Sequence, residues 1–358
     1  MRRSEFGVVP SPGPRPKMPS RRLLLERFGV AIALTLLLVG VATAGYVFSC
    51  PLPKGSPNVT VYVEPGASTA KVADLLHQNG VVRNPLAFRA LARIMRADGR
   101  LQSGEYQFEP GIFAWDAISS LVHGRVLYYS VTVREGLTVE QIATLVEGRG
   151  FGAKADILTL CKDSSLLPAL VSAADRAGVR YPLEGYLFPD TYYIRRGMTP
   201  KEIVQMMVSR FTAVFTAELA NKAKSRGISA HDAATLASIV EREAYAPEER
   251  AVIAAVYLNR LRIGMKLDAD PTVVYAIGKQ AGYAPLYKDL EADSPYNTYR
   301  NAGLPPGPIG NFGKASLEAV LAPASVDYLY FVAKKDGTHA FARTLSDHNQ
   351  NVRKYQGN

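Results

Sequence analysis

Residues that build metal and redox sites are scarce in this sequence. It contains two cysteines, Cys50 and Cys161, and no C-x-x-C, Cys/His cluster or H-E-x-x-H motif. A structural zinc site and a zinc-protease site are therefore not expected. Whether the two cysteines form a disulfide stays open, because the bond depends on a distance that the sequence does not give.

Motifs that supply a nucleophile or hold a phosphate are also missing. The 358 residues contain no G-x-S-x-G, no D-[ST]-G and no P-loop. Hydrolases with a nucleophile elbow, aspartic proteases and P-loop NTPases depend on those motifs for their chemistry. Their absence excludes these classes and leaves carboxylates as the candidate catalytic groups.

Acidic residues are outnumbered: 32 Asp and Glu stand against 42 Lys and Arg, and the formal net charge is +10. A basic surface attracts polyanions such as nucleic acid, anionic lipid and cell-wall polymer. Much of the excess lies at the N-terminus, so the rest of the chain is only mildly basic and a nucleic-acid partner is not expected. The charged residues of that region are Arg2, Arg3, Arg15, Lys17, Arg21, Arg22 and Arg27 against Glu5 and Glu26.

An uncharged run follows this basic region, from Gly29 to Phe48. About 20 helical residues span roughly 30 Å, the thickness of a hydrocarbon core. We expect a cytoplasmic tail at 1–28, a transmembrane helix at 29–48 and the remainder outside, because basic flanks stay in the cytoplasm. The alternatives are a cleaved signal peptide or a lipoprotein modified at Cys50. No A-x-A site follows, however, and Phe48 is bulky where lipidation needs a small residue.

Two segments of the chain, 61–76 and 131–146, resemble each other. Each predicts a short alternating strand, a glycine turn, a Ser/Thr cap and an amphipathic helix. This order resembles the LysM modules that bind N-acetylglucosamine polymers, so we expect a LysM-like subdomain at 49–130. A generic strand–helix unit without a ligand is an equally weighted alternative.

The remaining residues, 131–358, predict a larger and mainly helical domain. After Gly150, strands are expected only near the end of the domain, on either side of a turn at Lys335, Asp336 and Gly337. The whole pattern indicates an α+β fold, because no alternating βαβαβ rhythm is present. Expected helices lie at 153–162, 199–224, 230–245, 247–262 and 314–321, and expected strands at 328–333 and 338–342.

The helix predicted at 230–245 carries the strongest candidate for catalysis. At 100° per residue, Leu236, Ile239 and Val240 define its apolar face, and Glu243 lies at the centre of that face. Glu241 falls at the edge of the face, and Arg242 points away from it. Burial of a carboxyl group raises its pKa, so Glu243 is a candidate general acid. A structural Glu paired with an Arg is the alternative.

Other candidate residues are carboxylates and aromatic residues that occur close together in the sequence. Aromatic faces stack on sugar rings while polar groups bind the hydroxyls, so such segments suit a sugar-binding cleft. Rigid loops also use Tyr and Asn simply to form turns, and that alternative stays open. The candidates for substrate binding are Glu184, Tyr186, Asp190, Glu241, Asp270, Tyr296, Asn297 and Tyr299.

Several long motifs, taken together, resemble the YceG-like family of endolytic murein transglycosylases. They are L-E-G-Y-L-F-P-D-T-Y, L-A-S-I-V-E-R-E, L-N-R-L-R-I-G-M-K-L-D-A-D-P-T-V-V-Y, Y-N-T-Y, G-L-P-P-G-P-I and F-x-x-T-L-x-x-H-N. The resemblance covers about residues 59 to 355 and implies a LysM-like subdomain at 49–130 before a catalytic domain at 131–358. It implies that the catalytic acid is Glu243, the second acid of the E-x-E pair, which the helical-face argument also selects.

This resemblance implies a lytic reaction inside peptidoglycan strands. Glu243 would protonate the bond between N-acetylmuramic acid and N-acetylglucosamine, and the sugar's own C6 hydroxyl would close a 1,6-anhydro ring. No metal or cofactor is needed. The implied location is the cell inner membrane, with glycan strands as partner and cell-wall synthases as further candidates. The alternative is a non-catalytic membrane-anchored scaffold that binds glycan.

Overall fold

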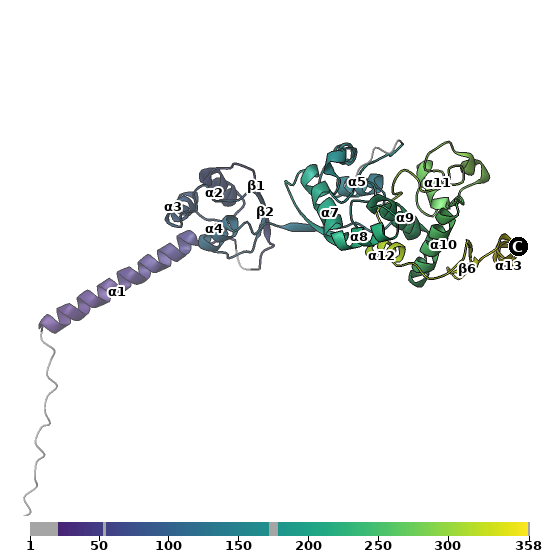
Figure 1. Cartoon of the computed structure of the whole chain (residues 1–358). Coiled ribbons are helices and arrows are strands. Elements are labelled where there is room, and N and C mark those ends of the chain that lie inside the picture. The colour runs from purple at the N-terminus through teal and green to yellow at the C-terminus, as the bar shows by residue number, and fades with distance from the viewer. Residues whose placement is uncertain (1–20, 53–54, 172–177, 357–358) are drawn as a thin grey trace, which may run out of the picture. The chain divides into compact units, whose positions relative to one another are not determined.

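A computed structural model describes residues 21–52, 55–171 and 178–356, with side chains from residue 26 onward. The chain divides into two compact units, Met1–Leu127 and Tyr128–Asn358, and Figure 1 labels many of the helices and strands of each. Most of the predicted cytoplasmic tail lies outside the described residues. The part from residue 21 is helical, so the first helix begins earlier than the predicted span.

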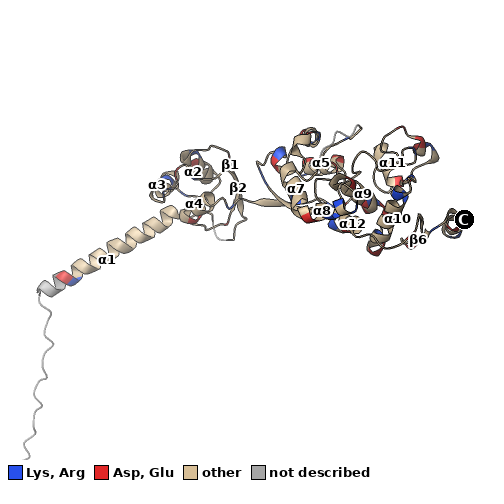
Figure 2. Ribbon diagram, viewed as in Figure 1, with Lys and Arg blue, Asp and Glu red and all other residues tan. Residues whose placement is uncertain are grey.

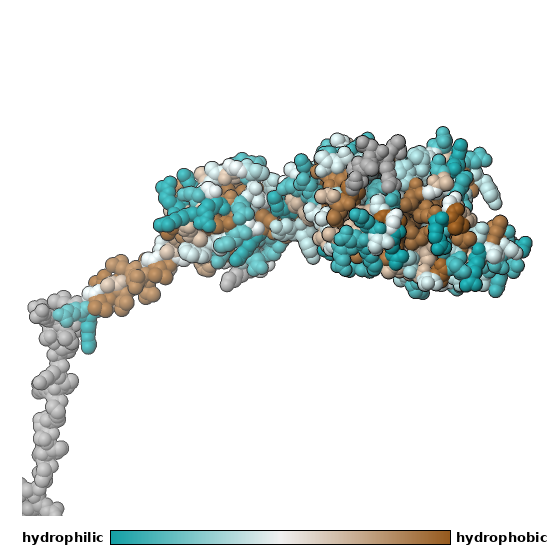
Figure 3. All heavy atoms as spheres, in the orientation of Figure 1, coloured by the Kyte–Doolittle hydropathy of each residue, from teal (hydrophilic) through white to brown (hydrophobic). Residues whose placement is uncertain are grey.

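The first helix, α1 (Arg21–Phe48), is apolar along most of its length. An 18-residue stretch within its segment Glu26–Phe48 has a mean hydropathy of 2.2 and no buried residue. Figure 3 shows mostly brown, hydrophobic atoms along this segment, and Figure 2 shows its ribbon in tan beyond the charged residues at its start. At 23 residues the segment is long enough to cross a membrane.

The first unit continues with β1 (Val59–Val63), α2 (Thr69–Gln78), α3 (Pro85–Ile94), β2 (Gly104–Phe108) and α4 (Ala114–Val122). β1 and β2 form an antiparallel pair in which Val59 faces Phe108. Ser68 caps α2 by accepting from the Lys71 amide. The Lys71 ammonium is bound to Glu64 at 2.6 Å.

The second unit opens with the same order of elements: β3 (Tyr128–Thr132), α5 (Val139–Gly148), α6 (Lys154–Cys161), the short 3-10 helix η1 (Ser164–Leu166) and β4 (Thr191–Arg195). β3 and β4 are antiparallel, with Val131 opposite Tyr192. Thr138 caps α5 in a capping box with Gln141. The predicted repeat is therefore confirmed, and each copy extends to strand, helix, helix, strand.

A helical core follows: α7 (Pro200–Val214), α8 (Ala217–Ser225), α9 (Ala230–Glu243), α10 (Arg250–Arg262), α11 (Asp270–Ala276) and α12 (Lys314–Leu321), with the 3-10 helices η2 (Pro247–Glu249) and η3 (Tyr287–Glu291) between them. α9 contacts α8, α10, α11 and α12, so it lies at the centre of this core. Its residues 233–240 are all buried.

One helix was predicted where the structure has two. The chain leaves helical geometry at Phe215, which is buried, and Thr216 caps α8 by accepting from the Leu219 amide. A buried aromatic residue followed by a cap ends one helix and starts the next. The prediction of an unbroken helix at 199–224 was therefore wrong.

The chain ends in the hairpin β5 (Tyr330–Ala333) and β6 (His339–Ala342), followed by α13 (Leu345–Tyr355). The hairpin was predicted, whereas α13 and the helix α11 over Asp270–Ala276 were not. Both cysteine thiols are buried and free. That of Cys50 donates to the Gly80 carbonyl at 3.2 Å.

Candidate active site

Glu243 is the last residue of α9. The helix starts at a capping box formed by Ser229 and Asp232, and its apolar face is buried in the core. Glu243 as a whole is only half-buried, but its carboxyl group is enclosed and accepts a hydrogen bond of 2.7 Å from the Tyr257 hydroxyl. The structure thus confirms the predicted burial of this carboxyl group.

The surroundings of Glu243 set its protonation. Burial raises the pKa of Glu243 to about 7, and the nearby Asp270 carboxylate acts in the same direction. The Tyr257 hydrogen bond and the cations of Arg260 and Arg242 oppose this shift. A carboxyl group with a pKa near 7 can donate a proton and accept one back at neutral pH, which is what acid–base catalysis requires.

A cavity of about 470 Å³ opens beside Glu243. Its walls are α10, the segment 267–270, Tyr299, the β5–β6 hairpin and α13. The chain therefore brings parts from the middle and the end of the second unit around one acid.

Arg260 organises one wall of this cavity. Its guanidinium donates to the carbonyls of Leu329 and Leu267 and lies 3.6 Å from the Asp268 carboxylate. Asp268 has a positive φ of 45°, a conformation that costs free energy in a non-glycine residue and is common at functional sites. Burial raises the pKa of Asp268.

Two other predicted site residues lie at the same cavity. Asp270 begins α11, and its carboxylate accepts a hydrogen bond of 2.6 Å from the Tyr299 hydroxyl. Glu243, Asp270 and Tyr299 are thus brought together as predicted. The segment Asp270–Tyr275 is helical, which places Asp270 in the first turn of α11, where it lines the cavity.

Glu184 lies elsewhere, beneath the start of α5. It is fully buried and accepts from the Val139 amide at 3.0 Å and the Tyr275 hydroxyl at 3.1 Å. Burial raises the pKa of Glu184 to about 8, although both hydrogen bonds oppose the shift. This carboxyl group connects α5 to α11 instead of lining the cavity of Glu243.

Tyr186 lies in the core with no exposed surface. Its hydroxyl bonds to Nδ1 of His231 at 2.7 Å, and Nε2 of His231 bonds to the Pro306 carbonyl at 2.8 Å. The carbonyl can only accept, so Nε2 carries the proton and Nδ1 accepts from Tyr186. This chain of bonds fixes the Pro-rich loop to α9, and it replaces the predicted contact of Tyr186 with substrate.

Three further predicted residues have partners outside the Glu243 cavity. The Asp190 carboxylate accepts from Arg210 at 2.6 Å. The Tyr296 ring is buried against Tyr275, and the side-chain amide of Asn297 donates to carbonyls of its own loop. These side chains hold loops in place, which for Tyr296 and Asn297 is the turn-forming alternative considered above.

The two acids at the end of α9, Glu241 and Glu243, have different partners. The Glu241 carboxylate accepts from the Gly313 amide at 2.9 Å and the Ser316 hydroxyl at 2.8 Å, at the start of α12. A carboxylate is favoured at a helix N-terminus, so Glu241 fixes α12. Arg242, predicted to point away from the apolar face, is half-buried and lines two other cavities.

Sequence reasoning missed several side chains of the Glu243 cavity. No local pattern predicts a site role for Tyr257, His339 or His348, and Arg260 occurs only within one of the long motifs. Tyr257 lies 14 residues after Glu243 on the next helix, a spacing that no local pattern reveals. His348 stacks on Tyr330 with its Nδ1 buried and unpaired within the described residues.

In the described ranges no group of three or more His, Cys, Asp or Glu side chains is arranged to hold a metal ion.

The fold and the cavity define an α+β protein, preceded by an apolar helix, with an enclosed acid at the end of its central helix.

Comparisons with known proteins identify the family within this class. Residues 61–354 match the YceG-like family. The chain is 35% identical to the endolytic murein transglycosylase of Bacillus subtilis strain 168 over 330 residues, which are 89% of this chain and 91% of that protein. It is 30% identical to the endolytic murein transglycosylase of Streptococcus pneumoniae D39 over 82% of this chain and 58% of that one. The chain therefore belongs to the YceG-like family.

A solved structure agrees with this assignment. A YceG-like protein from Listeria monocytogenes superposes with a TM-score of 0.57 at 34% identity, over 83% of this chain and 99% of that chain. The similarity thus extends over both the sequence and the fold.

Proposed function

We propose that this chain is an endolytic murein transglycosylase, a lyase that cuts peptidoglycan glycan strands between N-acetylmuramic acid and N-acetylglucosamine. The observation that supports it best is the enclosed carboxyl group of Glu243, which faces a cavity and has a pKa of about 7. A scaffold that only binds glycan gains nothing from a buried acid held in this way.

In the proposed reaction Glu243 is the catalytic acid and then the base. Its carboxyl proton passes to the glycosidic oxygen as the C1–O bond of muramic acid breaks, and the acetamido carbonyl stabilises the developing cation. The resulting carboxylate takes the proton of the C6 hydroxyl while that oxygen bonds to C1. The Tyr257 hydroxyl, 2.7 Å from Glu243, stabilises the carboxylate formed midway.

The nature of the products tests this reaction. A hydrolase needs a second carboxylate that activates water or attacks the sugar, and Asp268 and Asp270 are the other acids of the cavity. A lytic enzyme leaves 1,6-anhydromuramic ends, one water lighter than reducing ends. Digestion in heavy-oxygen water should add no label to the new ends. Labelled reducing ends as the main product would refute the lytic reaction and implicate Asp268 or Asp270.

For the first unit we propose a LysM-like role in holding the glycan strand. Its strand–helix–helix–strand order and a groove of about 480 Å³ along α2 support this. Tyr62, Glu64, Lys71 and Asp74 line the groove and offer one aromatic face with polar groups around it. Binding of purified strands to the chain should fall when Tyr62 is replaced by Ala, and unchanged binding would argue against this role.

We further propose that α1 anchors the chain in the cell inner membrane, with the N-terminus in the cytoplasm and both units outside. The basic residues before the apolar segment support this orientation. Protease added to spheroplasts should degrade the chain beyond residue 50, and full protection would contradict the orientation. There the enzyme would terminate or trim nascent strands beside the cell-wall synthases.

A further inference from the structure

A second cavity of the Tyr128–Asn358 unit, of about 310 Å³, is lined by Arg242 instead of Glu243. Its other walls are the exposed face of α5, the start of α6, Arg180 and the segment 278–281 after α11. Glu243 and Tyr257, which act in the proposed reaction, do not line this cavity. Arg242 is only the sequence neighbour of Glu243. The reaction as described leaves this cavity unexplained.

Arg242 is a half-buried cation in the wall of this cavity. Burial lowers its pKa, while the nearby carboxyl groups of Glu184 and Glu243 oppose that shift. Within the described part of the chain no hydrogen bond or ion pair to its guanidinium is found. An anionic ligand in the cavity could therefore complete the contacts of this partly desolvated cation.

Further cations face the same space. Lys154 is half-buried, while Arg180 and Lys279 are exposed at the rim. The walls contain two acids, Glu140 and Glu184. The Glu140 carboxylate already accepts from Tyr181 and lies 3.7 Å from Arg180. Glu184 at the floor has a pKa of about 8, so it adds little negative charge at neutral pH.

The cavity lies on the helix face that lines the groove of the first repeat copy. In that copy Lys71 and Asp74 line the groove. Their counterparts by repeat register in α5 are Gln141 and Thr144, and both line the basic cavity. The second copy has thus replaced a balanced pair of charges on its ligand face by neutral polar groups, and surrounding segments supply the cations.

We infer that this cavity is a subsite for a carboxylate of the peptide stems that project from the glycan strand. A guanidinium binds a carboxylate with two parallel hydrogen bonds, and Gln141, Thr144 and Lys154 can complete its shell. Glu140 in the wall favours a singly charged carboxylate over a phosphate dianion. The inference rests on the proposed function, since it concerns which strands the enzyme prefers.

The test compares two strand preparations with the full chain in detergent. One keeps its free stem carboxylates, and in the other they are converted to carboxamides. The wild type should show a KM about tenfold lower for the free-acid strands, with similar kcat, because a charge-assisted pair is lost with the amide. Arg242→Gln should raise KM about tenfold on free-acid strands only, so that the two preparations become equal.

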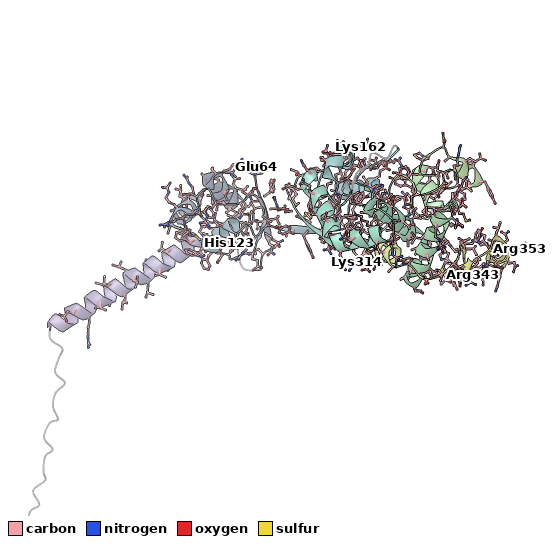
Figure 4. All side chains as sticks on the ribbon, viewed as in Figure 1. Glu64, His123, Lys162, Lys314, Arg343 and Arg353 are labelled. Carbon is pink, nitrogen blue, oxygen red and sulfur yellow. The ribbon has the colours of Figure 1, made fainter. Side chains whose placement is uncertain are left out.

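Matched lysine variants give the control. Lys279→Gln, at the rim, should reduce the preference about threefold. Lys162→Gln, the same change at an exposed residue labelled in Figure 4, should leave it at the wild-type value. Lys162 lies on the same unit and lines neither cavity.

Each outcome decides between the two proposals. Cleavage of neither preparation by the wild type contradicts the proposed function itself. Equal cleavage of both overturns the carboxylate subsite and leaves the function intact. An Arg242→Gln variant that loses activity equally on both strands also overturns the subsite, because Arg242 then acts through Glu243 or the fold. If Arg242→Gln does not fold, the preference of Lys279→Gln decides.

Discussion

Replacing Glu243 by Gln should stabilise the protein while it abolishes cleavage. Gln keeps the size of the side chain, and its amide oxygen can still accept from the Tyr257 hydroxyl. It lacks both the proton that the reaction needs and the buried charge that Glu243 carries at alkaline pH. Stability and activity therefore change in opposite directions at this residue.

The magnitude follows from the pKa of Glu243, about 7 in the folded protein against 4.5 for an ordinary glutamate. Between these values the folded state keeps a proton that the unfolded state has released. Stability is therefore lost as pH rises from about 4.5 to about 7. A shift of this size corresponds to about 3 kcal/mol above pH 7, and to nothing below about pH 4.5.

Thermal unfolding of the wild type and Glu243→Gln in the same detergent, at pH 4 and pH 8.5, measures this difference. The variant should unfold several degrees higher than the wild type at pH 8.5 and at nearly the same temperature at pH 4. A difference that does not depend on pH would refute the reasoning, because it would mean that Glu243 is not held with a raised pKa. Retained cleavage by a folded variant would refute its role as the acid.

Four further predictions concern this acid and its surroundings. Cleavage should fall as pH rises through about 7, because the general acid must be protonated. The Tyr257 hydrogen bond lowers the pKa of Glu243, so removing it in Tyr257→Phe should raise that pKa and move this limb of the pH–rate profile to higher pH. An unmoved limb would exclude the contact in solution. Glu241→Gln should keep the activity of the folded protein but lose about 1–2 kcal/mol in urea unfolding, as the charge that holds the start of α12 disappears. Gly313→Ala should change stability little, because an added Cβ would lie 1.8 Å from Oε1 of Glu135 but that oxygen ends an exposed, flexible side chain that can move aside; a loss of more than about 1 kcal/mol would show that Glu135 is held in place.

The sequence predicted those parts of the molecule that depend on local periodicity. The apolar face of α9 located Glu243, and the two Gly-turn segments located the start of both repeat copies. The closing strands β2 and β4 have little pattern of their own, because they are defined by pairing with β1 and β3 over a long sequence distance. The break between α7 and α8 likewise depends on the burial of Phe215 in a tertiary core.

The site was predicted less completely than the acid. Tyr186 ties the Pro-rich loop to α9 through His231, and Asn297 bonds within its own loop. Composition alone does not separate such residues from ones that bind sugar. Tyr257 and His348 reach the cavity from α10 and α13. Only the packing of those helices brings them to Glu243, so no sequence spacing indicated their place.

The second repeat copy limits how the chain can be divided into modules. Its α5 is bonded to Glu184, and its glycine turn exchanges backbone hydrogen bonds with the 310–313 loop through Gly136 and Asn311. The first copy belongs to a different compact unit. A chimera joined just before residue 128 should therefore preserve the catalytic unit, whereas a join placed after the second copy would split it. Of two similar repeats, one is an exchangeable part and the other has become a permanent piece of the enzyme.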